Sequence, residues 1–316
     1  MPYRLRKKKS VEKSIHKIAR EQIDRAIGEI DDEQLDRHDT VHQVRKRCKK
    51  IRGLIRLVRP RFEATYQREN AWYRDAAERL SYVRDAQSII ETLDELDQHF
   101  QEQIARDTFS QIRQPLTERR REVAEDQVGL RERLETCRQR MCEGRERVAA
   151  WQLDADEFDA VAPGLSKTYK RARGAMKQAY KHPCTECFHE WRKRAKYHWY
   201  HLRLLRPIWS DPVKARRDEA DLLSDYLGDD HDLSILRETL LAAPEQFGGN
   251  DTVQTAIGLM DRRQVELRTK AKALGERLFA EKPKQLLRRF GAYWTVWRRE
   301  TRREPQVVHK PELVTS

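Results

Sequence analysis

The sequence is poor in glycine, proline and cysteine, and it contains no long apolar run. It has 12 glycines and 11 prolines among 316 residues, and this scarcity favours long amphipathic helices over sheets. No window approaches the roughly 18 consecutive apolar residues of a membrane span, so we expect no transmembrane helix. The N-terminal segment MPYRLRKKKS is basic and no apolar run follows it, so we expect no secretory signal.

The five cysteines lack the spacing of a disulfide framework. Their odd number and scatter favour a reducing compartment, and we expect a cytoplasmic protein. Cys184 and Cys187 form a Cys-x-x-Cys motif between His182 and His189, and such a set could bind zinc. The alternative is a turn before a helix with incidental thiols. We prefer this alternative because the sequence has no second Cys-x-x-Cys, and we expect neither a metal nor a cofactor.

Positive charge dominates the composition. The chain has 65 Lys and Arg against 52 Asp and Glu, which gives a formal net charge of +13. An excess of this size implies a polyanionic partner or an anionic surface, without deciding between them.

The chain contains an internal repeat. The segment VHQVRKRCKKIRGLIRLVRP (41–60) aligns with FHEWRKRAKYHWYHLRLLRP (188–207) when it is shifted so that His42 falls on His189. The match continues from 74–93 to 217–240, where the second copy has a short insertion. We therefore expect one domain over residues 10–303, built from two related halves near 10–150 and 163–300.

Hydrophobic periodicity predicts an all-helical chain, and proline and glycine mark the helix ends. In the first half we expect helices near 11–31, 40–59, 67–97 and 100–149, with an interruption allowed in the third and a break near Pro115. In the second half we expect helices near 165–181, 186–206, 213–241, 252–281 and 284–301. We expect further breaks at Pro60, Pro163-Gly164, Pro183, Pro207, Pro212, Pro244 with Gly248-Gly249, and Pro283. The tail 304–316 lacks periodicity, and we expect it to be disordered.

The helix predicted over 40–59 carries a basic stripe directly beside an apolar stripe. The basic stripe consists of His42, Arg45, Lys49, Arg52, Arg56 and Arg59. The apolar stripe consists of Val41, Val44, Cys48, Ile51, Ile55 and Val58. The second copy repeats the plan with the basic residues His189, Arg192, Lys196, Arg203 and Arg206. A solvated charged face would lie opposite the apolar one, so these cations are expected at the edge of the core.

Two interpretations of the basic stripes are open. In the first, the stripes face a shared groove that holds a polyanion, since several like charges held together are costly without a counter-charge. In the second, the stripes form salt bridges with Asp and Glu of neighbouring helices. The repetition of the same pattern in two diverged halves favours the first interpretation.

The paired segments VHQVRKRCKKIR and FHEWRKRAKYHWY resemble the signature helices of the CHAD domain, the conserved histidine α-helical domain. LSYVRDAQSII, LSDYLGDDHDLSIL and ERLFAEKPKQLLRRFGAYW resemble later segments of the family. The resemblance implies an all-α fold of two four-helix bundles, related by a pseudo-twofold axis and packed as one unit around a basic groove or pore. It also implies non-catalytic binding of inorganic polyphosphate, an association with polyphosphate granules, and contact with proteins of polyphosphate metabolism.

Carried onto matching positions, the resemblance gives a set of ligand-facing residues. On the two signature helices they are His42, Arg45, Lys46, Lys49, Arg52, Arg56, His189, Arg192, Lys193, Lys196, Arg203 and Arg206. On the first helix of each half they are Lys17, Arg20, Lys170 and Arg173, and on the last long helices they are Arg138 and Arg268. Trp199 and Tyr197 stand where the first copy has Arg52 and Lys50, so the second half is expected to bind less strongly. Segment 98–151 does not align with the family pattern.

Two other functions remain as alternatives. Trp199, Tyr197 and Tyr200 beside the basic stripe could stack the bases of a single-stranded nucleic acid. The run GDDHD (228–232) could hold a metal of a phosphohydrolase. The repeat argues against this second alternative, because Arg84 stands where His231 does and an arginine does not ligate a metal. Asp85 and Asp232 are then expected to orient arginines, and His42 and His189 to stay protonated beside a polyanion.

Overall fold

The computed structural model describes residues 3–103 and 109–300, and within them every regular element is a helix. The all-α prediction is therefore confirmed for this part of the chain. The α-helices are α1 (Val11–Asp31), α2 (Arg37–Val58), α3 (Glu63–Glu78), α4 (Ser81–Phe100), α5 (Ser110–Glu125), α6 (Gln127–Arg147), α7 (Glu157–Lys181), α8 (Thr185–Leu205), α9 (Ser210–Ala242), α10 (Gly249–Leu278) and α11 (Pro283–Arg299). The tail predicted to be disordered, 304–316, lies outside the described residues. None of the described helices combines the length and apolar character that crossing a bilayer requires.

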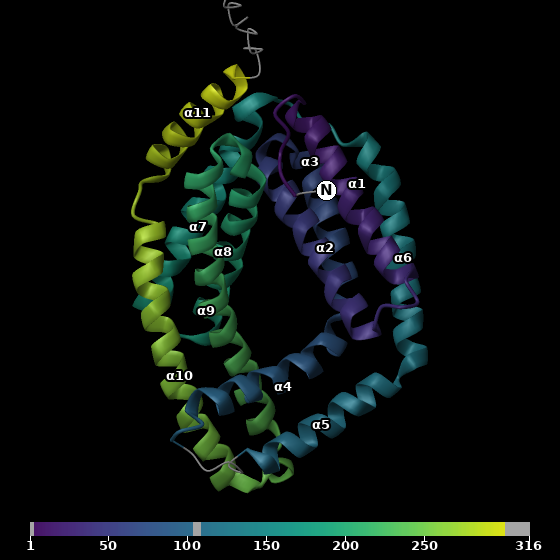
Figure 1. The fold of residues 1–316 in the computed structure, drawn as a ribbon, viewed down its shortest axis with the longest axis vertical. Helices are drawn as coiled ribbons and strands as arrows, with labels where there is room; N and C mark the ends of the chain where they lie inside the picture. Colours follow the sequence, from purple (N-terminus) through teal and green to yellow (C-terminus); the bar gives the residue numbers. More distant parts are fainter. Residues whose placement is uncertain (1–2, 104–108, 301–316) are drawn as a thin grey trace, which may run out of the picture.

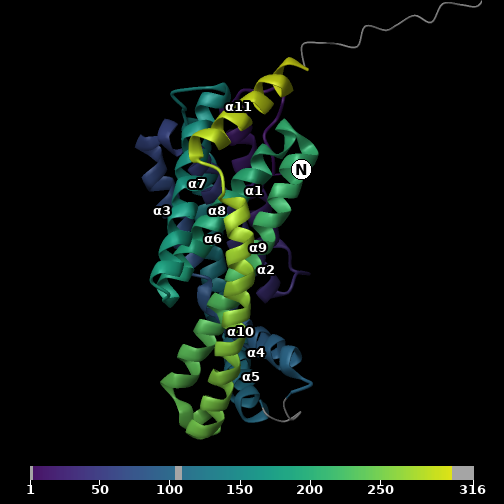
Figure 2. The same ribbon diagram turned by 90° about the vertical axis from the view of Figure 1, so that its left-hand side faces the viewer.

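The helices form two columns joined at both ends (Figure 1). Helices α1, α2, α3 and α6 make one column, and α7 to α10 make the other. At the lower end α4 and α5 cross from the first column to pack against α9 and α10. At the upper end α11 packs on α7 and on the turn after α8, as Figure 2 also shows. The arrangement of these columns about a pseudo-twofold axis stays a prediction.

Two clusters of buried apolar side chains stabilise the fold. The larger cluster is continuous across both halves and includes Ile51 and Leu54 of α2 together with Tyr169 of α7. The smaller one joins α4, α5, α9 and α10, for example through Leu93 and Met260. Tyr3 and Leu5 also belong to the larger cluster, upstream of residue 10, where we expected the domain to begin.

Most predicted helix ends agree with the structure. Pro60 and Pro207 lie in short 3₁₀ turns after α2 and α8, and Pro283 begins α11. Gly248 precedes α10 and Gly249 begins it, with φ of +85° and +84°, a left-handed backbone that glycine adopts without a steric penalty. The interruption allowed in 67–97 falls between α3 and α4.

Three predicted breaks are wrong, because Pro115, Pro163 and Pro212 lie inside α5, α7 and α9. Pro212 is in the first turn of its helix, where the missing N–H has no intrahelical partner to lose. At Pro115 and Pro163 the helix loses one backbone hydrogen bond, and burial of neighbours such as Leu116 in α5 and Leu165 in α7 offsets that cost. The break between α5 and α6 lies instead at Asp126, whose carboxylate accepts a hydrogen bond from the backbone N of Gly129 at 3.0 Å.

Gly164 lets the backbone of α7 pack directly against the backbone of α2. A Cβ atom at this position would lie 1.8 Å from the carbonyl oxygen of Leu57, so no other residue fits without a shift of one helix. The glycine that the sequence marks as a break is therefore a contact between the two halves.

Changing Gly164→Ala is expected to lower the free energy of unfolding by about 2 kcal/mol, the usual cost of overpacking a tight interface. Gly174→Ala on the same helix is the control, because a Cβ atom there would have nothing within 4 Å. This control is expected to raise stability by about 0.5–1 kcal/mol, since alanine favours the helix over glycine. Urea denaturation measures both, and effects of the same sign would contradict the close approach of α2 and α7.

Candidate functional site

The two signature helices, α2 and α8, cross at matching positions of the repeat. A Cβ at Gly53 of α2 would lie 2.9 Å from the Cβ of Tyr200, its counterpart in α8. From this crossing α2 and α8 separate towards α4 (Figure 1). The C-terminal halves of the two basic stripes are therefore brought together, while the N-terminal halves diverge.

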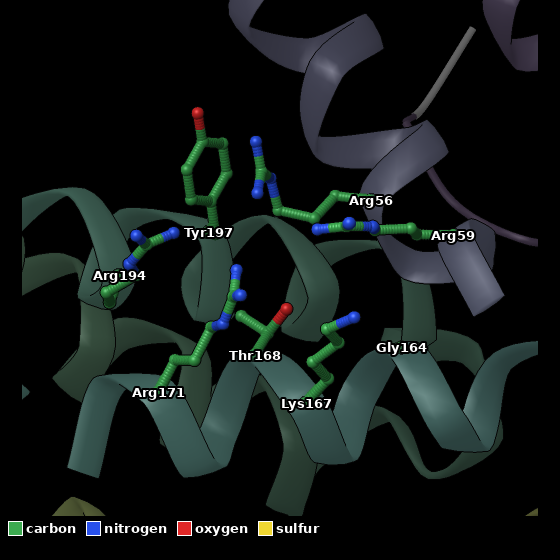
Figure 3. A pocket seen from close by; sticks show the side chains of 8 residues that line it. All are labelled: Arg56, Arg59, Gly164, Lys167, Thr168, Arg171, Arg194 and Tyr197. Atoms are coloured by element: carbon green, nitrogen blue, oxygen red, sulfur yellow. The ribbon is translucent and has the colours of Figure 1, made fainter. Parts of the chain in front are cut away.

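A small basic pocket lies beside this crossing, where α2 meets α7 and α8. It is lined by Arg56, Arg59, Gly164, Lys167, Thr168, Arg171, Arg194 and Tyr197. Figure 3 shows the cationic side chains converging from the three helices. The enclosed volume is about 10 Å³, roughly one water molecule. The lining holds five cations and no carboxylate among the described residues, so the pocket attracts anions.

Arg56 is a half-buried cation of the pocket. Its guanidinium lies 3.9 Å from the ring centre of Tyr197, and its Nη2 donates a hydrogen bond to Oδ1 of Asn70 at 3.2 Å. Its Nε is buried without a hydrogen-bond partner among the described residues. Burial lowers the pKa of Arg56, and the ring of Tyr197 partly offsets that effect. An aromatic ring and an amide therefore hold the Arg56 guanidinium, and no carboxylate of the described residues neutralises its charge.

The other cations of the pocket differ in their partners. Arg194 forms an ion pair with Glu190, and Arg59 pairs with the exposed Glu63 at 3.5 Å. Lys167 and Arg171 lie one helical turn apart on the exposed side of α7, with no ion pair in the described part of the chain. Together with Arg56, they leave three cations without a carboxylate.

The matching position in the other half of the repeat is filled by the N-terminal segment. Arg203 corresponds to Arg56 and Lys50 to Tyr197. The hydroxyl of Tyr3 donates a hydrogen bond to the carbonyl of Lys50 at 2.7 Å, and the Tyr3 ring lies 5.5 Å from the Arg203 guanidinium. Burial and the nearby Arg47 lower the pKa of Lys50 to about 7. The N-terminal segment thus occupies this second place, and only one of the two related positions is open.

The predicted residues of α2 fall into two groups. Arg45 donates a hydrogen bond to the carbonyl of Ala77 at 2.6 Å, and Arg52 shares Oδ1 of Asn70 with Arg56. These arginines help to fix α3 against α2. The side chains of His42 and Lys49 in the N-terminal part of the stripe are exposed on α2, and so is that of the neighbouring Lys46.

On α8 the salt-bridge interpretation is partly right. Lys196 lies 3.4 Å from Asp221 of the neighbouring helix α9, as that interpretation requires, whereas Lys193 pairs at 2.8 Å with Glu190 of its own helix. Trp199 lies between Lys196 and Arg203, with the two cations 4.2 Å and 4.7 Å from its ring centre. Part of this stripe is therefore already neutralised or covered.

His189 contacts a histidine that the sequence placed in a different motif. The Nδ1 atoms of His189 and His231 lie 3.1 Å apart, which requires one ring to donate a hydrogen to the other. Burial, followed by the charges of Lys193 and Arg192, lowers the pKa of His189. Burial also lowers the pKa of His231 to about 3, with His189 as the next cause. Without an anion the pair is therefore neutral at pH 7, so the protonated His189 that we expected requires a bound ligand.

The remaining predicted residues lie away from the pocket. Arg138 pairs with Asp31 at 2.7 Å, and Arg268 pairs at 2.6 Å with the buried Asp230 of the GDDHD run. Lys17 lies 4.0 Å from Glu21. Arg20 and Lys170 are exposed, Arg173 is half-buried, and Arg192 lies beside Gly228 of α9. Arg206 lines a separate open pocket of about 720 Å³ with the basic N-terminal residues Arg4, Arg6, Lys7 and Lys8.

The sequence placed Arg59 in the basic stripe of α2, but it did not select Lys167, Arg171 or Arg194 as site residues. Lys167 and Arg171 stand on α7 at i and i+4, the spacing of one helix face. The signal that could have found them is Gly164, because a glycine inside a helix often marks the close approach of another backbone.

The fold and the pocket define a class: an all-helical protein whose basic helices converge on an anion-attracting pocket. A comparison with protein families matches residues 17–241 to the CHAD domain. Because the match covers more than half of the chain, the protein belongs to the CHAD domain family. The resemblance seen in the signature helices is confirmed.

Two curated relatives from Mycobacterium tuberculosis match most of the chain. One, from strain CDC 1551 / Oshkosh, is 26% identical over 268 residues, and the other, from strain ATCC 25618 / H37Rv, is 27% identical over 272. Each match covers 80% of this chain and 50% of the relative. The chain thus spans about half the length of the curated relatives it matches. Both are uncharacterized proteins, so they suggest no activity.

Proposed function

We propose that the chain binds inorganic polyphosphate without catalysing its synthesis or breakdown. The observation that carries the proposal is Arg56, which is half-buried between an aromatic ring and an amide in a pocket lined by four further cations. A phosphate oxygen would supply the acceptor that Nε lacks, and arginine binds phosphate with a geometry that lysine does not match. Lys167 and Arg171 would then hold the next phosphates at the rim.

We propose that the polymer continues from the pocket along the diverging stripes of α2 and α8. The exposed cations of α2 extend this path, and binding there would add charge neutralisation without a shaped site. In this proposal the two halves are related by an approximate twofold axis, with the contact between Gly53 and Tyr200 as its support. A cytoplasmic location, with attachment to polyphosphate granules and their proteins, follows from the proposed ligand.

Nucleic acid is the less favoured polyanion because the aromatic rings are engaged. Arg56 covers Tyr197, while Lys196 and Arg203 cover Trp199. Tyr200 is buried, with 4% of its surface exposed. Base stacking needs a free ring face, so displacement of these cations would oppose it.

A metal-dependent phosphohydrolase is also less favoured. In the GDDHD run Asp230 binds Arg268 and His231 contacts His189, so these two side chains point to different partners. No group of three or more His, Cys, Asp or Glu in the described chain is arranged to hold a metal ion. The side chains of Arg84 and Asp85, which we compared with this run, lie outside the described residues.

The proposal is tested by titrating the purified chain with long-chain polyphosphate and with single- and double-stranded DNA at matched charge and salt. With about four phosphate contacts, the affinity for polyphosphate is expected to fall about 50-fold between about 50 and 200 mM salt. Nucleic acid that binds more tightly and resists displacement by polyphosphate would overturn the proposal. Release of phosphate that a chelator abolishes would favour hydrolysis instead.

A further inference from the structure

The Cys-x-x-Cys motif lies at the start of α8, away from the residues that line the basic pocket. Cys184 is the N-cap of this 21-residue helix, and Cys187 is in its first turn. The backbone N of Cys187 donates a hydrogen bond to Sγ of Cys184 at 3.2 Å. The two Sγ atoms lie 2.6 Å apart. The local fold therefore places both thiols side by side without help from any distant segment.

The other three cysteines lack this combination of contact and access. Cys48 and Cys137 are fully buried, and burial raises the pKa of Cys137 to about 12 and that of Cys48 still further. Cys142 is half-buried and is not paired with another thiol among the described residues. Cys184 and Cys187 are both partly exposed, so a small reagent can reach them. Reactivity of thiols follows access and thiolate character, which singles out this pair.

A metal site is the competing explanation for two adjacent thiols. A structural zinc site takes four ligands. The described residues provide no group of three or more His, Cys, Asp or Glu around one point. The flanking residues that we considered do not complete the set: His182 is exposed, and His189 binds His231 through Nδ1. Two thiols alone favour thiol chemistry over metal binding.

We propose that Cys184 and Cys187 form a redox-active dithiol that closes reversibly to an intramolecular disulfide by exchange with a small-molecule disulfide. The thiolate of Cys184 attacks one sulphur of the reagent, forming a mixed disulfide and releasing one thiolate. Cys187 then loses its proton and attacks Sγ of Cys184, closing the protein disulfide and releasing the second thiolate. The protein dithiol loses two electrons and two protons, and the reagent is reduced to two thiols.

The order of attack follows from the positions of the two sulphur atoms. Sγ of Cys184 accepts a hydrogen bond from the backbone N of Cys187 at the N-terminal end of α8, where the helix dipole stabilises a negative charge. The pKa of Cys187 is raised, first by its hydrogen bond to Cys184 and then by burial. Cys187 is therefore the thiol that keeps its proton until the mixed disulfide has formed.

The test uses the full chain carrying Cys142→Ser, treated with 5,5′-dithiobis(2-nitrobenzoate) under native conditions. The intact pair is expected to release two equivalents of the coloured thiol and to retain no adduct, with a mass lower by two hydrogens. Adding Cys187→Ser is expected to give one equivalent and a retained adduct on Cys184. Adding Cys184→Ser is expected to slow the reaction of the remaining thiol about tenfold, because that thiol is not at the N-cap.

A stable adduct on both cysteines of the intact pair would overturn the proposal, because the second thiol would then have failed to resolve the first. Equal rates for the two single-cysteine variants would overturn the assignment of Cys184 as the attacking thiol. Circular dichroism of each variant confirms that α8 stays folded. The readout does not involve polyphosphate, so its result is independent of the proposed function.

Discussion

Replacing Lys167 and Arg171 by glutamate is expected to lower the affinity for long-chain polyphosphate by at least about 100-fold. Each charge-assisted hydrogen bond to phosphate contributes about 1.5–3 kcal/mol, and the double change removes two and adds repulsion. A loss of about 3 kcal/mol corresponds to slightly more than two factors of ten. Isothermal titration at fixed salt measures the loss, and circular dichroism checks that the helices persist.

The matched control is Lys177→Glu with Lys181→Glu. These lysines are exposed on the same helix, the change in net charge is identical, and neither residue lines the pocket. We expect a loss below about fivefold, because a screened charge distant from the ligand contributes little. If both pairs of changes reduce affinity equally, net charge alone governs binding and the pocket has no special role.

The helical fold could be predicted from the sequence because its signals are local. Periodicity and punctuation place α1 at its observed bounds, and α2 begins only a few residues before the prediction. The earlier start has a local cause, since the carboxylate of Asp36 caps the helix by accepting a hydrogen bond from His38 N at 2.8 Å. The spacing of cations on α2 and α8 likewise predicted which faces carry charge.

The pocket could not be predicted, because it depends on which helix faces meet. Periodicity gives the apolar face of α7 but does not say that α2 crosses it at Gly164. That crossing brings Lys167 and Arg171 towards Arg56, while Lys170 and Arg173, the residues chosen by resemblance, do not line the pocket. Because Pro163 precedes Gly164, the sequence predicted a helix break at this position, and the structure has a helix–helix contact there instead.

The ion pairs of α8 and α10 also depend on residues distant in the sequence. Lys196 of α8 pairs with Asp221 of α9, and Arg268 of α10 pairs with Asp230 of α9. The sequence offers many carboxylates for each cation, and only the packing of α9 against α8 and α10 selects these pairs. The two interpretations of the basic stripes therefore each hold for part of the surface: open cations near Arg56, and paired ones along α8.

Acidification from pH 7 to pH 5 is expected to cost the protein about 4 kcal/mol of stability relative to a variant carrying His198→Phe and His201→Phe. Both imidazoles lie on α8 and are fully buried, each with 0% of its surface exposed. Burial lowers the pKa of His201 to about 3, with Arg56 as the next cause, and it lowers the pKa of His198 well below its usual value. A histidine in the unfolded chain takes up its proton near pH 6.5. At pH 5 this protonation stabilises the unfolded state over the folded state by about 2 kcal/mol per histidine.

The sign follows from proton binding. Below pH 6.5 the unfolded chain binds more protons than the folded one, so the stability present above that pH is lost as the pH falls towards 3. The half-buried carboxylate of Asp229 acts in the opposite direction, because partial burial raises its pKa to about 6 and the folded state gains a proton there. Urea denaturation at pH 7, 6 and 5 is therefore compared between the native chain and the variant, in which Asp229 is unchanged and its effect cancels. The exposed His182→Phe serves as the control and should follow the native chain. Parallel pH curves for the native chain and the double variant would show that the buried histidines already carry charge in the folded protein.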